Sequence, residues 1–172
     1  TGDLLWKKVI GTGNRDVRQG ESNSAAPSPS TDGEHVWAYF GTGIVVCFDF
    51  DGKEVWRTSL DERYGKFNSY FGIGTSPLLD GNRLYFQLLH VDAQVIVALD
   101  KSNGKEVWKH ERKTDAQSEC LHSYASPTIY RHDGQEFLLT HGSDYIVAHG
   151  LKDAPRSGGA EAYRTRPNTV TH

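Results

Sequence analysis

The segment Gly52-Lys53-Glu54-Val55-Trp56 recurs, residue for residue, as Gly104-Lys105-Glu106-Val107-Trp108, 52 positions further along the chain. The opening Gly2-Asp3-Leu4-Leu5-Trp6 keeps the glycine-to-tryptophan spacing, 50 positions earlier. Ser-Pro pairs recur at positions 28, 76 and 126, and Asp-Gly pairs at 32, 80 and 133. A fixed period of about 20 to 50 residues indicates a repeat architecture. The chain therefore contains three visible units and the end of a fourth.

Each unit contains short runs of β-branched, aromatic and aliphatic residues with a period of two, which is typical of half-buried strands. These runs are 35–40, 44–48 and 54–58 in the first unit, 83–88, 95–99 and 106–110 in the second, and 136–140 and 145–149 in the third. The Ser-Pro segment supplies one more strand per unit. No stretch has the apolar spacing of an amphipathic helix, so we expect very little helix.

Four antiparallel strands per repeat, with a glycine and an aromatic residue at fixed offsets, are typical of a β-propeller blade. The competing solenoids fit less well, because β-helix coils are shorter and helical repeats need a helical period. The predicted fold is all-β, a partial β-propeller of about three four-stranded antiparallel blades. Propellers close with about 4 to 8 blades. The chain is therefore expected to be a fragment of a larger propeller, or to associate with copies of itself, and the absence of Met favours the fragment.

We divide residues 1–172 as one incomplete propeller domain. Residues 1–22 are the end of a preceding blade, and 23–62 and 70–113 are blades. Residues 121–165 form a degenerate blade, because Gly150 stands where the other units have Asp, and the best aromatic candidate, Tyr163, comes 15 residues after Ala148. The tail 153–172 shows no strand period and is expected to be poorly ordered. The charged run at 61–63 is expected to be a solvated loop.

The segment from Ala98 to Trp108 resembles the tryptophan-docking motif of pyrroloquinoline-quinone-type (PQQ-like) propellers, Ala-x-Asp-x-x-(Thr/Asn)-Gly-x-x-x-Trp. The segment from Cys47 to Trp56 is similar, one residue shorter and with Cys at the Ala position. That family includes scaffold lipoproteins of outer-membrane assembly and quinoprotein dehydrogenases. The resemblance implies that Trp56 stacks between Cys47 and the Gly104 turn, and that Trp6 lies near the Gly52 turn. The structural docking residues it implies are Trp6, Cys47, Asp49, Gly52, Trp56, Ala98, Asp100, Gly104 and Trp108.

The residue types in the motif have a physical reason that does not depend on the family. Asp49 and Asp100 can accept backbone hydrogen bonds in the tight turn that follows, and the glycine supplies a positive φ. The two cysteines, Cys47 and Cys120, are 73 positions apart and lack metal-ligand spacing. Each is expected to be a small buried residue in a strand.

The composition of the chain argues against nucleic-acid binding and against a membrane span. A net charge of −3 disfavours nucleic-acid binding, and no apolar run approaches the roughly 20 residues of a membrane span. No signal-peptide pattern follows Thr1, so we expect a signal peptide either to be absent or to lie upstream of Thr1, and the absence of Met favours the second. The resemblance to exported relatives implies a periplasmic or secreted protein.

Quinoprotein dehydrogenases have an adjacent Cys pair near the cofactor and an oxygen-ligand set around calcium, and neither can be named here. We therefore expect no catalytic residues and no cofactor or metal.

Two hypotheses about function follow. The first is a non-catalytic binding or scaffold module in the bacterial cell envelope or outside the cell. The alternative is a fragment of a PQQ-dependent dehydrogenase acting on alcohols or sugars, with PQQ and calcium as cofactors. The expected partners are the remaining blades of a parent chain and a protein or small-molecule ligand on the propeller face, and packing between blades stays an equal alternative for the loop residues. The candidate loop residues are Tyr64, Phe67, Tyr70, Phe71, His122 and Tyr124.

Overall fold

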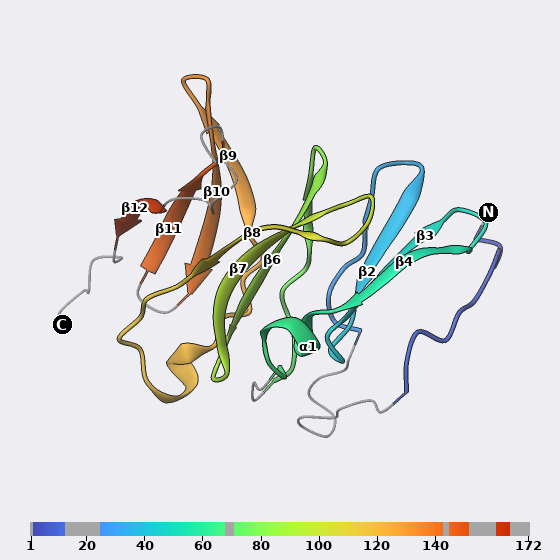
Figure 1. Cartoon of the computed structure of the whole chain (residues 1–172), viewed down its shortest axis with the longest axis horizontal. Coiled ribbons are helices and arrows are strands. Elements are labelled where there is room, and N and C mark those ends of the chain that lie inside the picture. Colours follow the sequence, from blue (N-terminus) through green and yellow to red (C-terminus); the bar gives the residue numbers. More distant parts are fainter. Residues whose placement is uncertain (1, 13–24, 68–70, 143–144, 152–160, 166–172) are drawn as a thin grey trace.

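A computed structural model describes residues 2–12, 25–67, 71–142 and 145–151, and the backbone of 161–165. Three four-stranded antiparallel sheets fan out in chain order, and their strands are paired in the order of the sequence (Figure 1). We call the sheets blades 1, 2 and 3. Blade 1 contains β1 (Ser30–Thr31), β2 (His35–Tyr39), β3 (Ile44–Asp49) and β4 (Glu54–Ser59); blade 2 contains β5 (Leu78–Asp80), β6 (Arg83–His90), β7 (Ala93–Asp100) and β8 (Glu106–Glu111); blade 3 contains β9 (Thr128–His132), β10 (Gln135–Gly142), β11 (Tyr145–Gly150) and β12 (Glu161–Thr165). The predicted partial β-propeller is confirmed.

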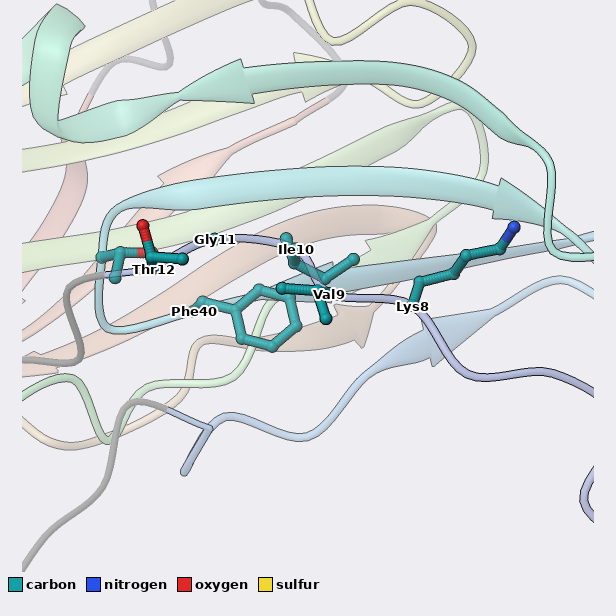
Figure 2. A pocket seen from close by; sticks show the side chains of 7 residues that line it. Lys8, Val9, Ile10, Gly11, Thr12 and Phe40 are labelled. Atoms are coloured by element: carbon teal, nitrogen blue, oxygen red, sulfur yellow. The ribbon is translucent and has the colours of Figure 1, made fainter.

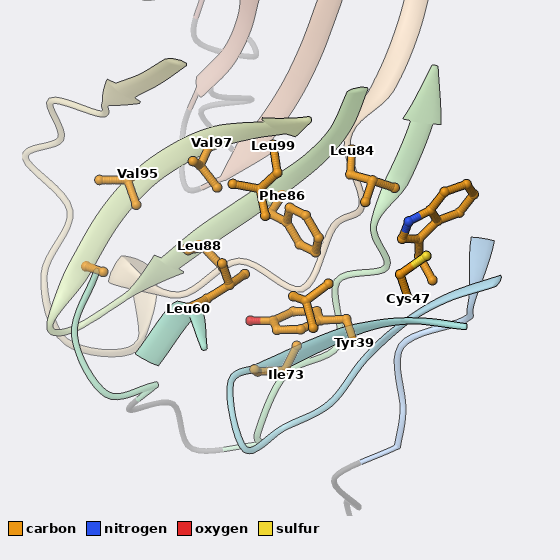
Figure 3. Close-up of a cluster of buried hydrophobic side chains, with 13 residues drawn as sticks. Tyr39, Cys47, Leu60, Ile73, Leu84, Phe86, Leu88, Val95, Val97 and Leu99 are labelled. Carbon is orange, nitrogen blue, oxygen red and sulfur yellow. The ribbon is translucent and has the colours of Figure 1, made fainter. Parts of the chain in front are cut away.

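The main core fills the space between blades 1 and 2. Figure 3 shows side chains from β6 and β7 meeting Tyr39 and Cys47 of blade 1, with Leu60 and Ile73 closing one end. Because side chains alternate across a strand, Val95, Val97 and Leu99 face blade 1. The intervening Ile96 and Ala98 belong to a second cluster with Leu138 of blade 3. Blade 2 is buried on both faces, which explains why its two central strands are almost continuously apolar.

The first strands of the three blades converge through a ladder of serines. The backbone N–H of Ser28 donates to Ser76 Oγ, and the backbone N–H of Ser76 donates to Ser126 Oγ, each at 2.9 Å. These are the serines of the recurring Ser-Pro pairs. The ladder joins each blade to the next at the same point of the repeat.

Two short helices correct the sequence prediction. The run 61–63 lies in α1 (Leu60–Tyr64), not in a loop, because the Ser59 hydroxyl caps the helix by accepting from Glu62 N and Leu60 is buried in the core. The 3₁₀-helix η1 (Ser118–Leu121) contains Cys120, which is exposed. The prediction that Cys120 is buried in a strand is therefore wrong, whereas Cys47 is buried in β3. Within the described residues, neither helix approaches the length or apolarity of a membrane span.

Residues 161–165, the end of the predicted degenerate blade, form β12 although their sequence shows no strand period. Its backbone pairs with β11 from Ile146↔Thr165 to His149↔Glu161, with a bulge between Ala148 and His149. Pairing with a strand edge uses backbone groups, so it does not require the alternating side-chain pattern on which the prediction depended. The rest of 153–172 lies outside the described residues.

Candidate functional site

The junction between blades 1 and 2 is centred on Trp56 and Gly104. A Cβ on Gly104 would lie 2.7 Å from Trp56 Cε3, and Gly104 has a φ of +68°. The indole N–H of Trp56 donates to the Lys101 carbonyl at 2.9 Å, and Cys47 is the register partner of Trp56 on the neighbouring strand. The ring thus lies flat against a backbone that only glycine leaves open.

Trp6 makes the same contact one unit earlier. A Cβ on Gly52 would lie 2.8 Å from the Trp6 ring, and the Trp6 indole N–H donates to the Phe50 carbonyl at 3.0 Å. The Trp6 and Phe48 ring centroids are 5.5 Å apart. The neighbouring Leu4 and Leu5 are largely exposed.

The two motif carboxylates hold the turns that receive these rings. Asp49 Oδ1 accepts from the backbone N–H of Asp51 and of Lys53, at 3.1 and 2.8 Å. Asp100 Oδ1 accepts from the backbone N–H and the hydroxyl of Ser102, at 2.8 and 2.6 Å. The hydrogen bond from the Ser102 side chain is the main reason that the pKa of Asp100 is lowered. Both aspartates are therefore engaged in shaping the backbone.

The junction between blades 2 and 3 is different. Trp108 is buried and is the register partner of Ala98, but its indole N–H has no hydrogen-bond partner among the described residues. Its ring packs against Tyr85 and His149, with centroids 6.0 and 6.4 Å away. Gly150 stands at the aspartate position of the motif, and the counterpart of Gly104 lies outside the described residues. The degenerate third unit therefore changes the contact as well as the motif.

A buried polar network, which sequence reasoning missed, also joins blades 2 and 3. The side-chain amide of Gln87 donates to Ser123 Oγ at 2.8 Å and to the His141 carbonyl at 2.7 Å. Nearby, the Arg112 guanidinium donates twice to Gln94 Oε1, whose own amide donates to the Leu121 carbonyl. The sequence signal that could have indicated this network is the presence of Gln87 and Gln94 within otherwise apolar strands.

We expect Gln87→Leu to lower the free energy of unfolding by about 2 kcal/mol, because it removes hydrogen bonds to buried polar groups of blade 3. The exposed Gln135→Leu is the control and should change stability by less than about 0.5 kcal/mol. Urea unfolding followed by circular dichroism measures both. Equal effects of the two substitutions would contradict a role for the Gln87 network.

Two of the candidate loop residues lie in the core region. The Tyr64 hydroxyl donates to Glu106 Oε2 at 2.5 Å, and Tyr64 and Phe67 pack against the cluster between blades 1 and 2. The Phe67 ring also lies 4.3 Å from that of His90, centroid to centroid. These two residues therefore pack between blades, which was the alternative to a role in ligand or partner binding. Tyr70 lies outside the described residues.

The other candidates come together. Phe71 and Tyr124 form an edge-to-face pair with centroids 5.9 Å apart, and His122 lies 6.4 Å from Tyr124. We call Phe71, His122 and Tyr124 the aromatic loop cluster. Tyr124 is 39% exposed, whereas His122 is buried. Both loops lead directly into the first strands of their blades, β5 and β9, so the serine ladder positions this cluster where two blades converge.

A separate cavity of about 260 Å³ lies along residues 8–12 (Figure 2). It is lined by that segment together with Phe40 and Thr42 of the turn between β2 and β3. None of the sequence-predicted site residues lines it. The cavity therefore lies between residues 8–12 and the turn that joins β2 and β3.

The side chains that most often ligate metals lie apart in the part of the chain that the structure describes. Within the described residues, no three His, Cys, Asp or Glu side chains converge as ligands for a metal ion. Cys47 is buried in β3, where burial raises the pKa of its thiol to about 11, and Cys120 is exposed on η1.

Blades of this form, joined by an indole against a glycine turn, define a β-propeller of PQQ-type repeats. The chain matches the family model of the outer membrane protein assembly factor BamB over residues 1–165, and it belongs to that family.

Solved structures show the same fold. BamB from Moraxella catarrhalis is 19% identical, with a TM-score of 0.57 over 82% of this chain and 37% of that one. The quinohemoprotein alcohol dehydrogenase from Comamonas testosteroni is 17% identical, with a TM-score of 0.62 over 85% and 22%. A europium-containing methanol dehydrogenase is 14% identical, with a TM-score of 0.64 over 95% and 27%. The chain thus spans less than two-fifths of each of these proteins. No curated protein matches it.

Proposed function

We propose that the chain is part of a non-catalytic propeller that binds a protein partner in the bacterial envelope. The aromatic loop cluster is the observation that carries this proposal. Tyr124 presents a large ring to solvent while its neighbours hold it in place, an arrangement common in protein-binding surfaces. The family match to an outer-membrane assembly factor supports a protein partner and an envelope location.

The cluster suits a partner surface better than an enclosed ligand site. Phe71 and Tyr124 stand on separate loops, and the Tyr124 side chain packs over Gly74 with closest contacts of 3.4 Å to a Cβ built there. Rigid aromatic anchors lose little conformational entropy when a partner docks. A protein surface that inserts an apolar side chain beside Tyr124 would therefore gain contact area at low cost.

Site-specific photocrosslinking tests the proposal. A photoreactive residue replaces Tyr124 in one variant and the exposed Val107 of β8 in a matched control, in the parent protein expressed in its own envelope. We expect a discrete protein adduct from position 124 that Phe71→Ala reduces at least about fivefold, and none from position 107. Identical adduct patterns at the two positions would overturn the proposal.

The alternative is a segment of a PQQ-dependent dehydrogenase, because two dehydrogenases share the fold. Titration of the parent protein with pyrroloquinoline quinone and calcium, followed by dye reduction with an alcohol or a sugar, tests it. Cofactor absorbance with turnover would establish the alternative and remove the non-catalytic proposal. Lack of both would remove the alternative.

A further inference from the structure

One equivalent position distinguishes the two blade junctions. The residue after the motif's alanine position is Phe48 in blade 1, Leu99 in blade 2 and His149 in blade 3. All three side chains are buried, and His149 is 1% exposed. Phe48 and His149 each face the tryptophan of the preceding repeat, Trp6 and Trp108 respectively. Blade 3 therefore places an imidazole where the other blades place a hydrocarbon side chain.

Residues of three neighbouring strands, β8, β10 and β12, surround or pair with His149. From β8, the His110 ring approaches edge to face, with centroids 5.0 Å apart. From β10, Thr140 Oγ1 lies 3.0 Å from His149 Nε2, and Leu138 is the register partner. On β12 the register partner is Glu161. His149 Nδ1 has no hydrogen-bond partner among the described residues.

We propose that the junction between blades 2 and 3 is an acid-sensitive joint, in which protonation of His149 beside His110 releases blade 3 from blade 2. A buried imidazolium loses its hydration, and the neighbouring His110 disfavours the charge on His149 further. Among the described residues, the Trp108 indole N–H has no carbonyl partner like the one that fixes Trp56, so the joint depends more on the packing of His149. The junction between blades 1 and 2 has Leu99 at the equivalent position and stays closed.

The direction of the pH effect follows from the same geometry. Burial, and then the neighbouring His110, lower the pKa of His149 from 6.5 to about 4. The open joint therefore binds a proton more tightly than the closed joint. The closed form is fully favoured above pH 6.5, and its advantage falls as the pH approaches 4. The equilibrium constant for opening the joint should rise about tenfold for each unit by which the pH falls in this window. The total rise is about 300-fold.

Hydrogen–deuterium exchange of the whole chain, corrected for intrinsic rates, tests the proposal. Between pH 6.5 and 4.5 we expect protection of β10 and β11 to fall by up to about 100-fold, and protection of β2 and β3 to fall much less. His149→Leu should abolish this difference, and His110→Gln should reduce it. Glu161→Gln measures any contribution of the register partner on β12. His90→Leu changes global stability and should leave the difference in protection between blade 3 and blade 1 in place.

His149→Phe, which copies Phe48, is the second variant if the leucine variant does not fold. The proposal is overturned if either folded variant keeps the wild-type pH dependence in β10 and β11. Parallel loss of protection in blades 1 and 3, with one midpoint, would overturn it equally, since that pattern is global unfolding. The test is independent of the partner surface, because it needs neither a ligand nor turnover.

Discussion

Gly104→Ala is expected to lower the free energy of unfolding by about 3 to 5 kcal/mol, close to the cost of deleting a buried aromatic side chain. The new Cβ would stand 2.7 Å from the Trp56 ring, and the ring cannot move away without losing its hydrogen bond to the Lys101 carbonyl. The backbone also has a φ of +68°, which alanine adopts at a cost. Urea unfolding measures the loss.

Gly81→Ala is the matched control. Gly81 also has a positive φ, +55°, but a Cβ there would meet nothing within 4 Å. Its substitution should cost only the backbone strain, about 1 to 2 kcal/mol. The difference between the two variants isolates the contact with the indole ring. Equal losses of unfolding free energy in the two variants would show that the packing of Trp56 does not require a glycine at position 104.

The second large effect is acid destabilisation through His90. The side chain is buried, and burial, only partly offset by the nearby Asp92, lowers its pKa from 6.5 to about 4. The unfolded chain therefore binds the proton more tightly, so stability is complete above pH 6.5 and falls as the pH drops to 4. We expect His90 to contribute about 3 kcal/mol of this loss.

His90→Leu should remove that contribution and flatten the pH dependence of unfolding by the same amount. His132→Leu is the control, because the His132 side chain is 65% exposed and its substitution should leave the slope unchanged. Urea unfolding at a series of pH values between 7 and 4 gives both slopes. A wild-type slope in His90→Leu would exclude His90 as the source.

Much of the fold is predictable because its signals lie in single repeated residues. A constant spacing separates the glycine and tryptophan of the first two units and of the one that precedes them. The alternation around Val95 and Val97 indicates strands directly. The capped helix at Leu60 was missed because one Ser59 hydroxyl decides it. β12 was missed because its pairing depends on the β11 backbone, and Cys120 was misplaced because apolar neighbours do not distinguish a strand from a 3₁₀ turn.

The candidate site was less predictable. Aromatic loop composition alone does not separate Tyr64, which packs inward, from Tyr124, which faces solvent, because the difference depends on which blade each loop meets. Trp37 gave no repeat signal, yet its indole N–H donates to the same Lys101 carbonyl as that of Trp56. The Gln87 network spans residues 54 positions apart, and no local pattern connects them.

The serine ladder bears on how such a chain lengthens during evolution. Each rung joins a main-chain N–H, which every repeat possesses, to one hydroxyl, which each repeat carries itself. A duplicated unit therefore brings both halves of the joint and fits its new neighbours without any compensating substitution. Gene duplication can add or remove a whole unit in one event, and only the residues that face outward then need to diverge.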